Sequence, residues 1–189
     1  MRISAFRPAR DDDAGVTMVE LLIYIVISTL ALAALAALFA NAVRADATTR
    51  DRDSATDAAQ LMVASVQSGI RSSSSFTVST ATVDGSVAPI LRASVLTGAG
   101  SWTWQCRAWA VTASGGFVSS SSRLADGSYT GWKPLVPGAR VEGALPAGQP
   151  FGDRNPLLQL GLKVTVGSAT VPISTGVVRQ TTGPGALTC

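Results

Sequence analysis

The chain has 189 residues, of which 47% are hydrophobic and 14% are charged, and its formal net charge is +3. It has no histidine, which excludes the Ser-His-Asp and Cys-His schemes of nucleophilic catalysis and the usual zinc sites. Glu142 is the only glutamate after Glu20, and no glycine-rich phosphate loop of the expected form occurs. We therefore expect no catalytic residues, no metal site and no cofactor. Nucleic-acid binding is not indicated by so modest a charge.

Residues 1–15 have the composition of a leader rather than of a folded element. Three arginines and then three consecutive aspartates give this segment a formal charge of zero, and Gly15 ends it. The apolar run of residues 21–40 that follows has about the ~20 residues that a helix needs to cross a hydrocarbon core of ~30 Å. This order predicts a processed leader ahead of a single membrane-spanning helix.

Glu20 is a carboxylate at the mouth of this apolar run. A charged side chain inside a bilayer costs ~2.5–3.5 kcal/mol on insertion scales and usually has a partner. In a helix that starts at Val16, Glu20 lies at position i+4, on the same face as the terminal amine. Such an amine is largely cationic at neutral pH, so the amine of a neighbouring subunit would be a suitable partner. The alternative is a first-turn glutamate that only suits the helix dipole, which is worth ~0.3–1 kcal/mol.

The segment Gly15-Val16-Thr17-Met18-Val19-Glu20, followed by the apolar run, resembles the N-terminus of type IV prepilins and of the pseudopilins of type II secretion systems. The resemblance implies that a prepilin peptidase cuts after Gly15. It further implies that Val16 becomes the N-methylated mature N-terminus and that Glu20 guides assembly. Two features depart from the family pattern: Gly15 has no lysine or arginine beside it, and valine replaces the favoured phenylalanine at the first mature position.

The same resemblance predicts location and partners. The chain would cross the cytoplasmic membrane once with its N-terminus in the cytoplasm, and the remainder would join a periplasmic or extracellular filament. Its partners would be other pilin or pseudopilin subunits, the prepilin peptidase and the membrane assembly machinery. A mature chain of this length, residues 16–189, with one predicted sheet, Glu20 and a long loop resembles a minor pilin or a J-type minor pseudopilin. Whether such a filament serves secretion, DNA uptake, adhesion or motility stays open.

Two alternatives compete with this interpretation. Ala40-Asn41-Ala42 has the small-x-small pattern of a signal-peptidase site, and cleavage there would release a soluble β-rich domain beginning at Val43. Secretory signals, however, have a basic n-region and an apolar region of ~7–15 residues, whereas this n-region is neutral and the apolar run is longer. The second alternative is a membrane-anchored extracytoplasmic binding domain that is unrelated to filaments.

Residues 44–71 continue the helical pattern beyond the apolar segment 16–43. Apolar residues recur there at intervals of three or four, as in an amphipathic helix: Ala55, Ala59, Met62, Val66 and Ile70. No proline occurs between residues 16 and 71, so we expect one continuous helix, ~80 Å long at 1.5 Å per residue. A bend or break near residues 46–53, where charges cluster, is the alternative.

Residues 72–189 are rich in serine, threonine, glycine and valine and predict an extracytoplasmic β-sheet domain. The segments expected to form strands are 76–83, 90–97, 102–112, 117–124, 157–166, 170–173 and 176–180. Their short, regular spacing predicts an antiparallel sheet. Together with the helix, this gives an α+β, pilin-like fold in which the helix packs on the sheet.

Strict alternation in residues 102–110 places Trp102, Trp104 and Cys106 on one face of a strand. We expect this face to be buried against the helix, because core packing is a commoner role for such aromatic residues than a ligand platform.

The segment 133–156 contains five prolines and several glycines. It predicts a long surface loop, and loops of this length are commonly functional or mobile. The segment is a candidate for contact with a partner, or else a variable insertion.

The chain has two cysteines, Cys106 and Cys189. An even number in an exported domain is consistent with a disulfide, which would tie the C-terminal tail to the sheet. The alternative is a free, buried Cys106. Type IV pilins often have a C-terminal disulfide, but their cysteines are usually closer together in the sequence.

Overall fold

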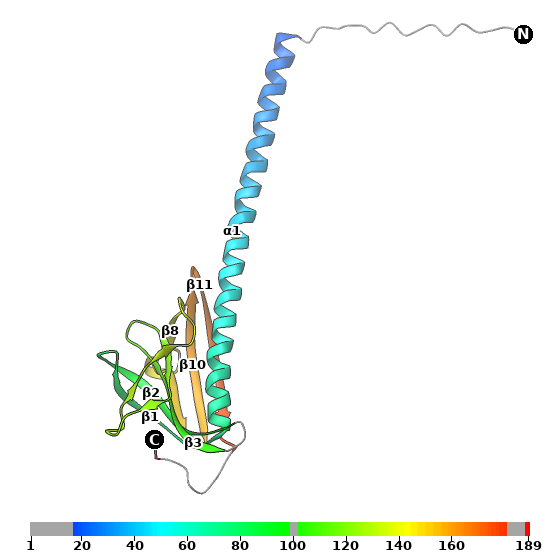
Figure 1. Ribbon diagram of the computed structural model, residues 1–189. Coiled ribbons are helices and arrows are strands. Elements are labelled where there is room, and N and C mark those ends of the chain that lie inside the picture. Colours follow the sequence, from blue (N-terminus) through cyan, green and yellow to red (C-terminus); the bar gives the residue numbers. More distant parts are fainter. Residues whose placement is uncertain (1–16, 99–101, 181–187) are drawn as a thin grey trace, which may run out of the picture. The chain divides into compact units, whose positions relative to one another are not determined.

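The structure, a computed structural model, describes residues 17–98, 102–180 and 188–189. The chain divides into two compact units, of which the first ends at Asp46 and the second begins at Ala47. Helix α1 (Met18–Arg71) supplies residues to both units (Figure 1). The predicted continuous helix is therefore confirmed from Met18 onward, and the charged stretch 46–53 does not interrupt it.

The second unit contains the strands β1 (Ser73–Val83), β2 (Ser86–Thr97), β3 (Thr103–Val111), β4 (Phe117–Ser120), β5 (Ser122–Arg123), β6 (Tyr129–Thr130), β7 (Lys133–Pro134), β8 (Arg140–Gly143), β9 (Phe151–Arg154), β10 (Leu157–Val166) and β11 (Ala169–Val178), with the short 3-10 helix η1 (Pro146–Gly148) before β9. One sheet has the order β1-β2-β3-β4-β7, and a second has the order β11-β10-β8 with β9 also paired to β10. Strands β5 and β6 form a separate hairpin. All these pairings are antiparallel, which confirms the α+β class, although the strands divide among several sheets rather than one.

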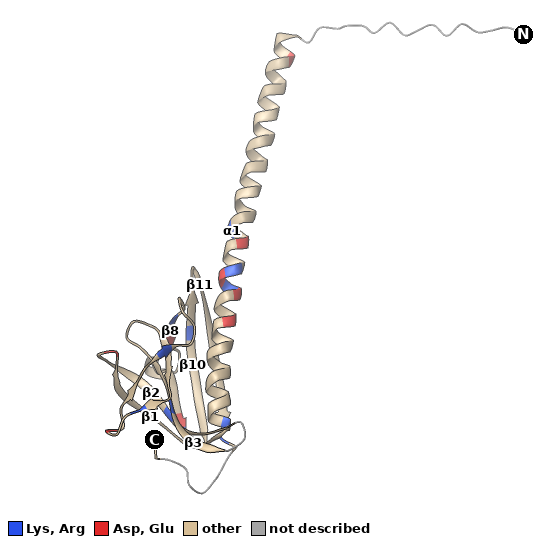
Figure 2. Cartoon of the chain, viewed as in Figure 1, with Lys and Arg blue, Asp and Glu red and all other residues tan. Residues whose placement is uncertain are grey.

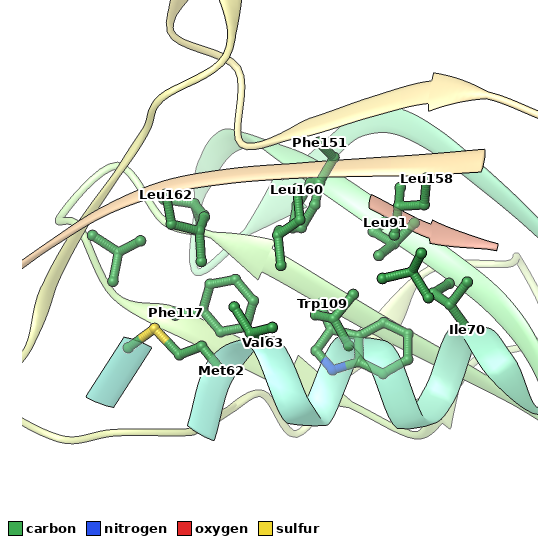
Figure 3. Close-up of a cluster of buried hydrophobic side chains, with 14 of the residues drawn as sticks. Met62, Val63, Ile70, Leu91, Trp109, Phe117, Phe151, Leu158, Leu160 and Leu162 are labelled. Carbon is green, nitrogen blue, oxygen red and sulfur yellow. The ribbon is translucent and has the colours of Figure 1, made fainter. Parts of the chain in front are cut away.

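The main core lies between the second half of α1 and the two larger sheets. The apolar face predicted for this half of the helix is buried, from Ala55 to Ile70. Figure 3 shows Met62 and Ile70 of α1 on one side of the cluster and leucines of β10 on the other, with Trp109 and Phe117 between them. Helix and sheets thus share a single apolar interior.

Trp109 of β3 is the largest side chain in this core and is fully buried. Its indole Nε1–H donates a hydrogen bond to Ser65 Oγ at 3.0 Å, so the ring is anchored to α1. Gly69 of the same helix lies directly against the ring, and a Cβ at that position would overlap the indole carbons. A glycine in a helix interior is ordinarily worse than alanine by ~0.8–1.0 kcal/mol, so its presence here is explained by the space that Trp109 needs.

The prediction that Trp102, Trp104 and Cys106 are buried against the helix is wrong. The alternation is present, but Trp102 is 72% exposed, and Cys106 belongs to a separate cluster on the opposite face of the sheet. The face that contacts α1 is the one that carries Trp109. Both faces of β3 are apolar near its end, with Ala108 on one and Trp109 on the other, so alternation alone could not show which face covers the helix.

The long loop predicted for residues 133–156 is also wrong, because the segment contains β7, β8, η1 and β9. Three of its five prolines occupy positions that suit a residue without a backbone N–H donor. Pro134 lies in β7 at the edge of the first sheet, Pro146 opens η1, and Pro150 precedes β9. The segment packs through Phe151 into the main core.

Asp51 of α1 holds the turn between β10 and β11. Its Oδ2 accepts the backbone N–H of Ser168 at 2.8 Å and the Ser168 hydroxyl at 2.9 Å. Gly167, with φ of +56°, brings the turn so close that an added Cβ would overlap the carboxylate. The Ser168 N–H and then its hydroxyl hold the pKa of Asp51 below its ordinary value.

We expect Asp51→Ala to release this turn from the helix. Because the pKa of Asp51 is lower in the folded than in the unfolded chain, its contribution is present above the unfolded value of about 3.9 and is lost as the pH falls through the folded value. The protection factor of the Ser168 amide, its exchange rate relative to that of the unfolded chain at the same pH, should therefore fall on acidification in the wild type. In Asp51→Ala the protection factor of this amide should be low at every pH, whereas the exposed Asp57→Ala should behave as the wild type. Equal protection of Ser168 in both variants would contradict the assignment.

Candidate functional site

The N-terminal part of α1, residues 18–43, has an apolar surface on all its sides. Its large side chains are exposed, among them Leu22, Ile25, Leu35 and Phe39. No charged residue occurs between Glu20 and Arg44 (Figure 2). By length and composition this part of the helix is suited to cross a membrane, and none of its apolar stretch is buried within the protein.

The start of α1 is set by Thr17. The Thr17 hydroxyl accepts the backbone N–H of Glu20 at 3.2 Å, and its carbonyl accepts the N–H of Leu21 at 3.1 Å. The first bond is that of an N-cap residue, and the sequence Thr17-Met18-Val19-Glu20 has the spacing of a capping box. The helix therefore begins at a polar cap immediately before the apolar surface.

Glu20 is exposed in the first turn of α1. The hydroxyl of Tyr24, one turn later, donates a hydrogen bond to Glu20 Oε1 at 3.3 Å. A carboxylate has about four lone-pair sites, so this bond leaves Glu20 able to accept a cationic donor from outside the helix. In the part of the chain that the structure describes, no cation pairs with Glu20.

The predicted processing residues Gly15 and Val16 lie outside the described residues. Of the predicted N-terminal site, the structure therefore places Glu20 alone. It adds Thr17 and Tyr24, whose contacts with Glu20 had not been predicted. The sequence spacing does contain a signal for both contacts, since a Thr-x-x-Glu sequence marks a helix start and side chains four apart meet on one helix face.

Cys106 and Cys189 form a disulfide, as predicted, with their Cα atoms 5.6 Å apart. The alternative of a free Cys106 is therefore wrong. The bridge attaches residue 189 to β3 on the face away from α1. Cys189 packs there against a second apolar cluster, named here the outer cluster: Val83, Ala88, Ile90, Cys106, Ala108, Ala110, Val118 and Tyr129.

Among residues 17–98, 102–180 and 188–189, no group of three histidine, cysteine, aspartate or glutamate side chains is placed to hold a metal ion. Comparisons with models of protein families, with curated proteins and with solved structures find no match to the chain. A functional proposal therefore depends on the chemistry of the chain's own residues, above all on the exposed apolar half of α1 and its single carboxylate.

Proposed function

We propose that the chain is a structural subunit, a minor pilin or pseudopilin, of a type IV pilus-like or type II secretion-like filament. A prepilin peptidase would cut it after Gly15, and it would assemble through the N-terminal part of α1. The observation that carries the proposal is the surface of residues 18–43, which is apolar all round and carries one carboxylate in its first turn.

A helix with such a surface is stable in two surroundings, a lipid bilayer and a bundle of similar helices. Transfer from the first to the second gains little from the hydrophobic effect, because lipid tails are as apolar as leucine. Packing and polar contacts between helices must then decide the assembly. Glu20 is the one charged group available in this stretch, and a cationic terminal amine of a neighbouring subunit is the partner that it would select.

The disulfide supports an exported location for the second unit. Disulfides persist in oxidising compartments such as the periplasm or the cell surface and are rare in the cytosol. A bridge between Cys106 and Cys189 therefore suits a chain whose N-terminus stays in the cytoplasm while residues 47–189 are exported. This topology is the one that assembly from the cytoplasmic membrane requires.

Processing tests the proposal directly. When the full chain is expressed with a prepilin peptidase, we expect the membrane fraction to contain residues 16–189 with a methylated Val16, as seen by intact mass and N-terminal analysis. Without the peptidase the leader should remain. When the peptidase is present, Gly15→Leu should prevent removal of the leader. Ala42→Leu, which removes the small residue of the competing signal-peptidase site, should change nothing.

Two results would contradict the proposal. A mature terminus at Val43 would show that the apolar segment is a secretory signal, although Ala40-Asn41-Ala42 lies within α1. An uncut chain in the presence of an active peptidase would favour a membrane-anchored binding domain unrelated to filaments.

A further inference from the structure

A pocket lies between the β5–β6 hairpin and the outer face of β1 and β2. Its volume is about 490 Å³, within the range of ~300–1,000 Å³ that is typical of small-molecule sites. Its wall includes Arg92 of β2, Arg123 of β5, Tyr129 of β6 and Trp132, together with two threonines of β1. The pocket belongs to the second unit and shares no residue with the N-terminal part of α1.

Two polar atoms in this wall are buried without a hydrogen-bond partner. Tyr129 is 6% exposed and its hydroxyl has no acceptor or donor in the protein, and the same is true of Nε of Arg92. The two side chains are neighbours, because the Arg92 guanidinium lies 6.0 Å from the centre of the Tyr129 ring. Buried polar groups are nearly always hydrogen-bonded, so two orphans in one wall indicate an acceptor supplied from outside. Neither atom is accessible to solvent, so the side chains must shift slightly for an acceptor in the pocket to reach them.

Both groups act as donors at neutral pH. A guanidinium can only donate. Burial raises the pKa of the Tyr129 hydroxyl, and this effect exceeds the opposing influence of Arg123 and Arg92, so the phenol keeps its proton. The acceptor that fits is therefore an oxygen, and an anionic one is favoured by the positive charges around it.

The only carboxylate in the pocket wall as described is already engaged. Asp126 Oδ1 accepts the backbone N–H of Ser128 at 2.9 Å and the Ser128 hydroxyl at 2.6 Å, which closes the turn of the hairpin. The Ser128 hydroxyl and backbone N–H hold the pKa of Asp126 below its ordinary value, so the group stays ionised and bound to the turn. Arg92 and Arg123 thus leave the pocket with a net positive charge.

Trp132 adds an apolar surface to this charged wall. The indole is half-buried, and its ring centre lies 6.0 Å from that of Tyr129 with the planes tilted by 45°. It packs against the outer cluster and also lines the pocket. An indole beside guanidinium groups suits a ligand that has both an apolar ring face and an anionic oxygen.

We propose that this pocket binds a sugar that carries a carboxylate, a uronic acid. The carboxylate would lie between Arg92, Arg123 and the Tyr129 hydroxyl, and the C–H face of the pyranose ring would lie on Trp132. Inorganic phosphate would satisfy the donors but leave the indole face unused, and a neutral sugar would leave the donors unpaired. The site does not depend on filament assembly, so its failure and that of the proposed function are distinguishable.

The experiment is a titration of the full chain in detergent micelles with glucuronate and with digalacturonate. Binding is detected by calorimetry and by tryptophan fluorescence. We expect saturable binding of the uronates and at least tenfold weaker binding of glucose, acetate and inorganic phosphate, because each lacks one of the two recognised features. Tyr129→Phe should weaken uronate binding about tenfold or more by removing one hydrogen bond to a charged group. Trp132→Leu should have a similar effect.

Stability measurements separate binding from folding. The Tyr129 hydroxyl has no partner in the protein, so Tyr129→Phe should leave the unfolding midpoint unchanged or raise it while affinity falls. The exposed Trp102→Leu matches Trp132→Leu in ring loss, and Lys163→Gln on β10 removes a positive charge outside the pocket. Both controls should bind as the wild type. Lys133→Gln tests a second positively charged pocket of about 280 Å³ beside Arg107 and should also have no effect.

Several outcomes would overturn the proposal. If glucose or phosphate binds as tightly as glucuronate, the pocket does not recognise a sugar carboxylate. An affinity that is unchanged in Tyr129→Phe, or one that falls equally in Lys133→Gln, would show that charge alone attracts the anion. An absence of saturable uronate binding to the folded chain would exclude the site.

Discussion

Replacing Cys189 with serine is expected to lower the free energy of unfolding of the second unit by about 4–5 kcal/mol in the chain-entropy model. The bridge joins residues 83 positions apart, and a loop of that length restricts the unfolded chain strongly. Cys189 is the better position for the test, because it is only half-buried whereas Cys106 lies in the outer cluster. A serine at 189 therefore removes the bond with little loss of packing.

Urea unfolding of the full chain in micelles, followed by tryptophan fluorescence, measures this effect. Cys106→Ser and the double variant Cys106→Ser/Cys189→Ser are the controls. Each single substitution breaks the same bond, so the double variant should lose much less than the sum of the two single losses. The unreduced wild type should also resist alkylation at both cysteines. A Cys189→Ser variant within about 1 kcal/mol of the wild type would contradict the assigned role of the bridge, since even typical disulfides contribute 2–4 kcal/mol.

The helical half of the fold could be predicted from the sequence because its signals are local. Periodic apolar residues between Ala55 and Ile70 define the buried face, and the absence of proline allows one helix. Strand β10 was predicted with its observed bounds for the same reason, since Leu157–Val166 is bordered by turn residues.

The strands between residues 133 and 156 could not be predicted because pairing, rather than propensity, defines them. Strand β7 is defined by its pairing with β4, and strands β8 and β9 are defined by their pairing with β10. Each is short. Other strands separate β7 from β4 and β8 from β10 along the chain, whereas β9 forms a local hairpin with β10 but has only four residues. Tertiary contacts of this kind override local preference and leave no periodic signal.

The two candidate sites differ in the same way. Glu20 and its apolar surroundings occupy one continuous segment, so the sequence is sufficient to find them. The pocket at Tyr129 combines β1, β2 and the β5–β6 hairpin, and its residues come together only through sheet register. Arg92, for example, lies opposite Ala108 of β3. Nothing in the spacing of Arg92, Arg123 and Tyr129 indicates that they meet.

Replacing Glu20 with glutamine is expected to leave membrane insertion intact or improved, because a charge is removed from the edge of the apolar segment. Cleavage after Gly15 should persist as well, since the proposed cut would lie on the cytoplasmic side of the helix. Crosslinking to neighbouring subunits in cells should fall about tenfold or more, because a lost coupling of only about 1.4 kcal/mol changes an association constant tenfold. The physical cause is a terminal amine that leaves water without its carboxylate.

The contacts of Glu20 supply the controls for this experiment. Tyr24→Phe removes the hydroxyl that donates to Glu20 Oε1 but keeps the carboxylate, so crosslinking should be close to that of the wild type. Thr17→Val removes the N-cap hydroxyl and tests whether a weaker helix start alone disturbs assembly. Glu20→Asp keeps the charge with a shorter side chain and should restore part of the yield. If Glu20→Gln crosslinks as the wild type does at equal expression, Glu20 is only a first-turn residue that suits the helix dipole, and the assembly role proposed for it is wrong.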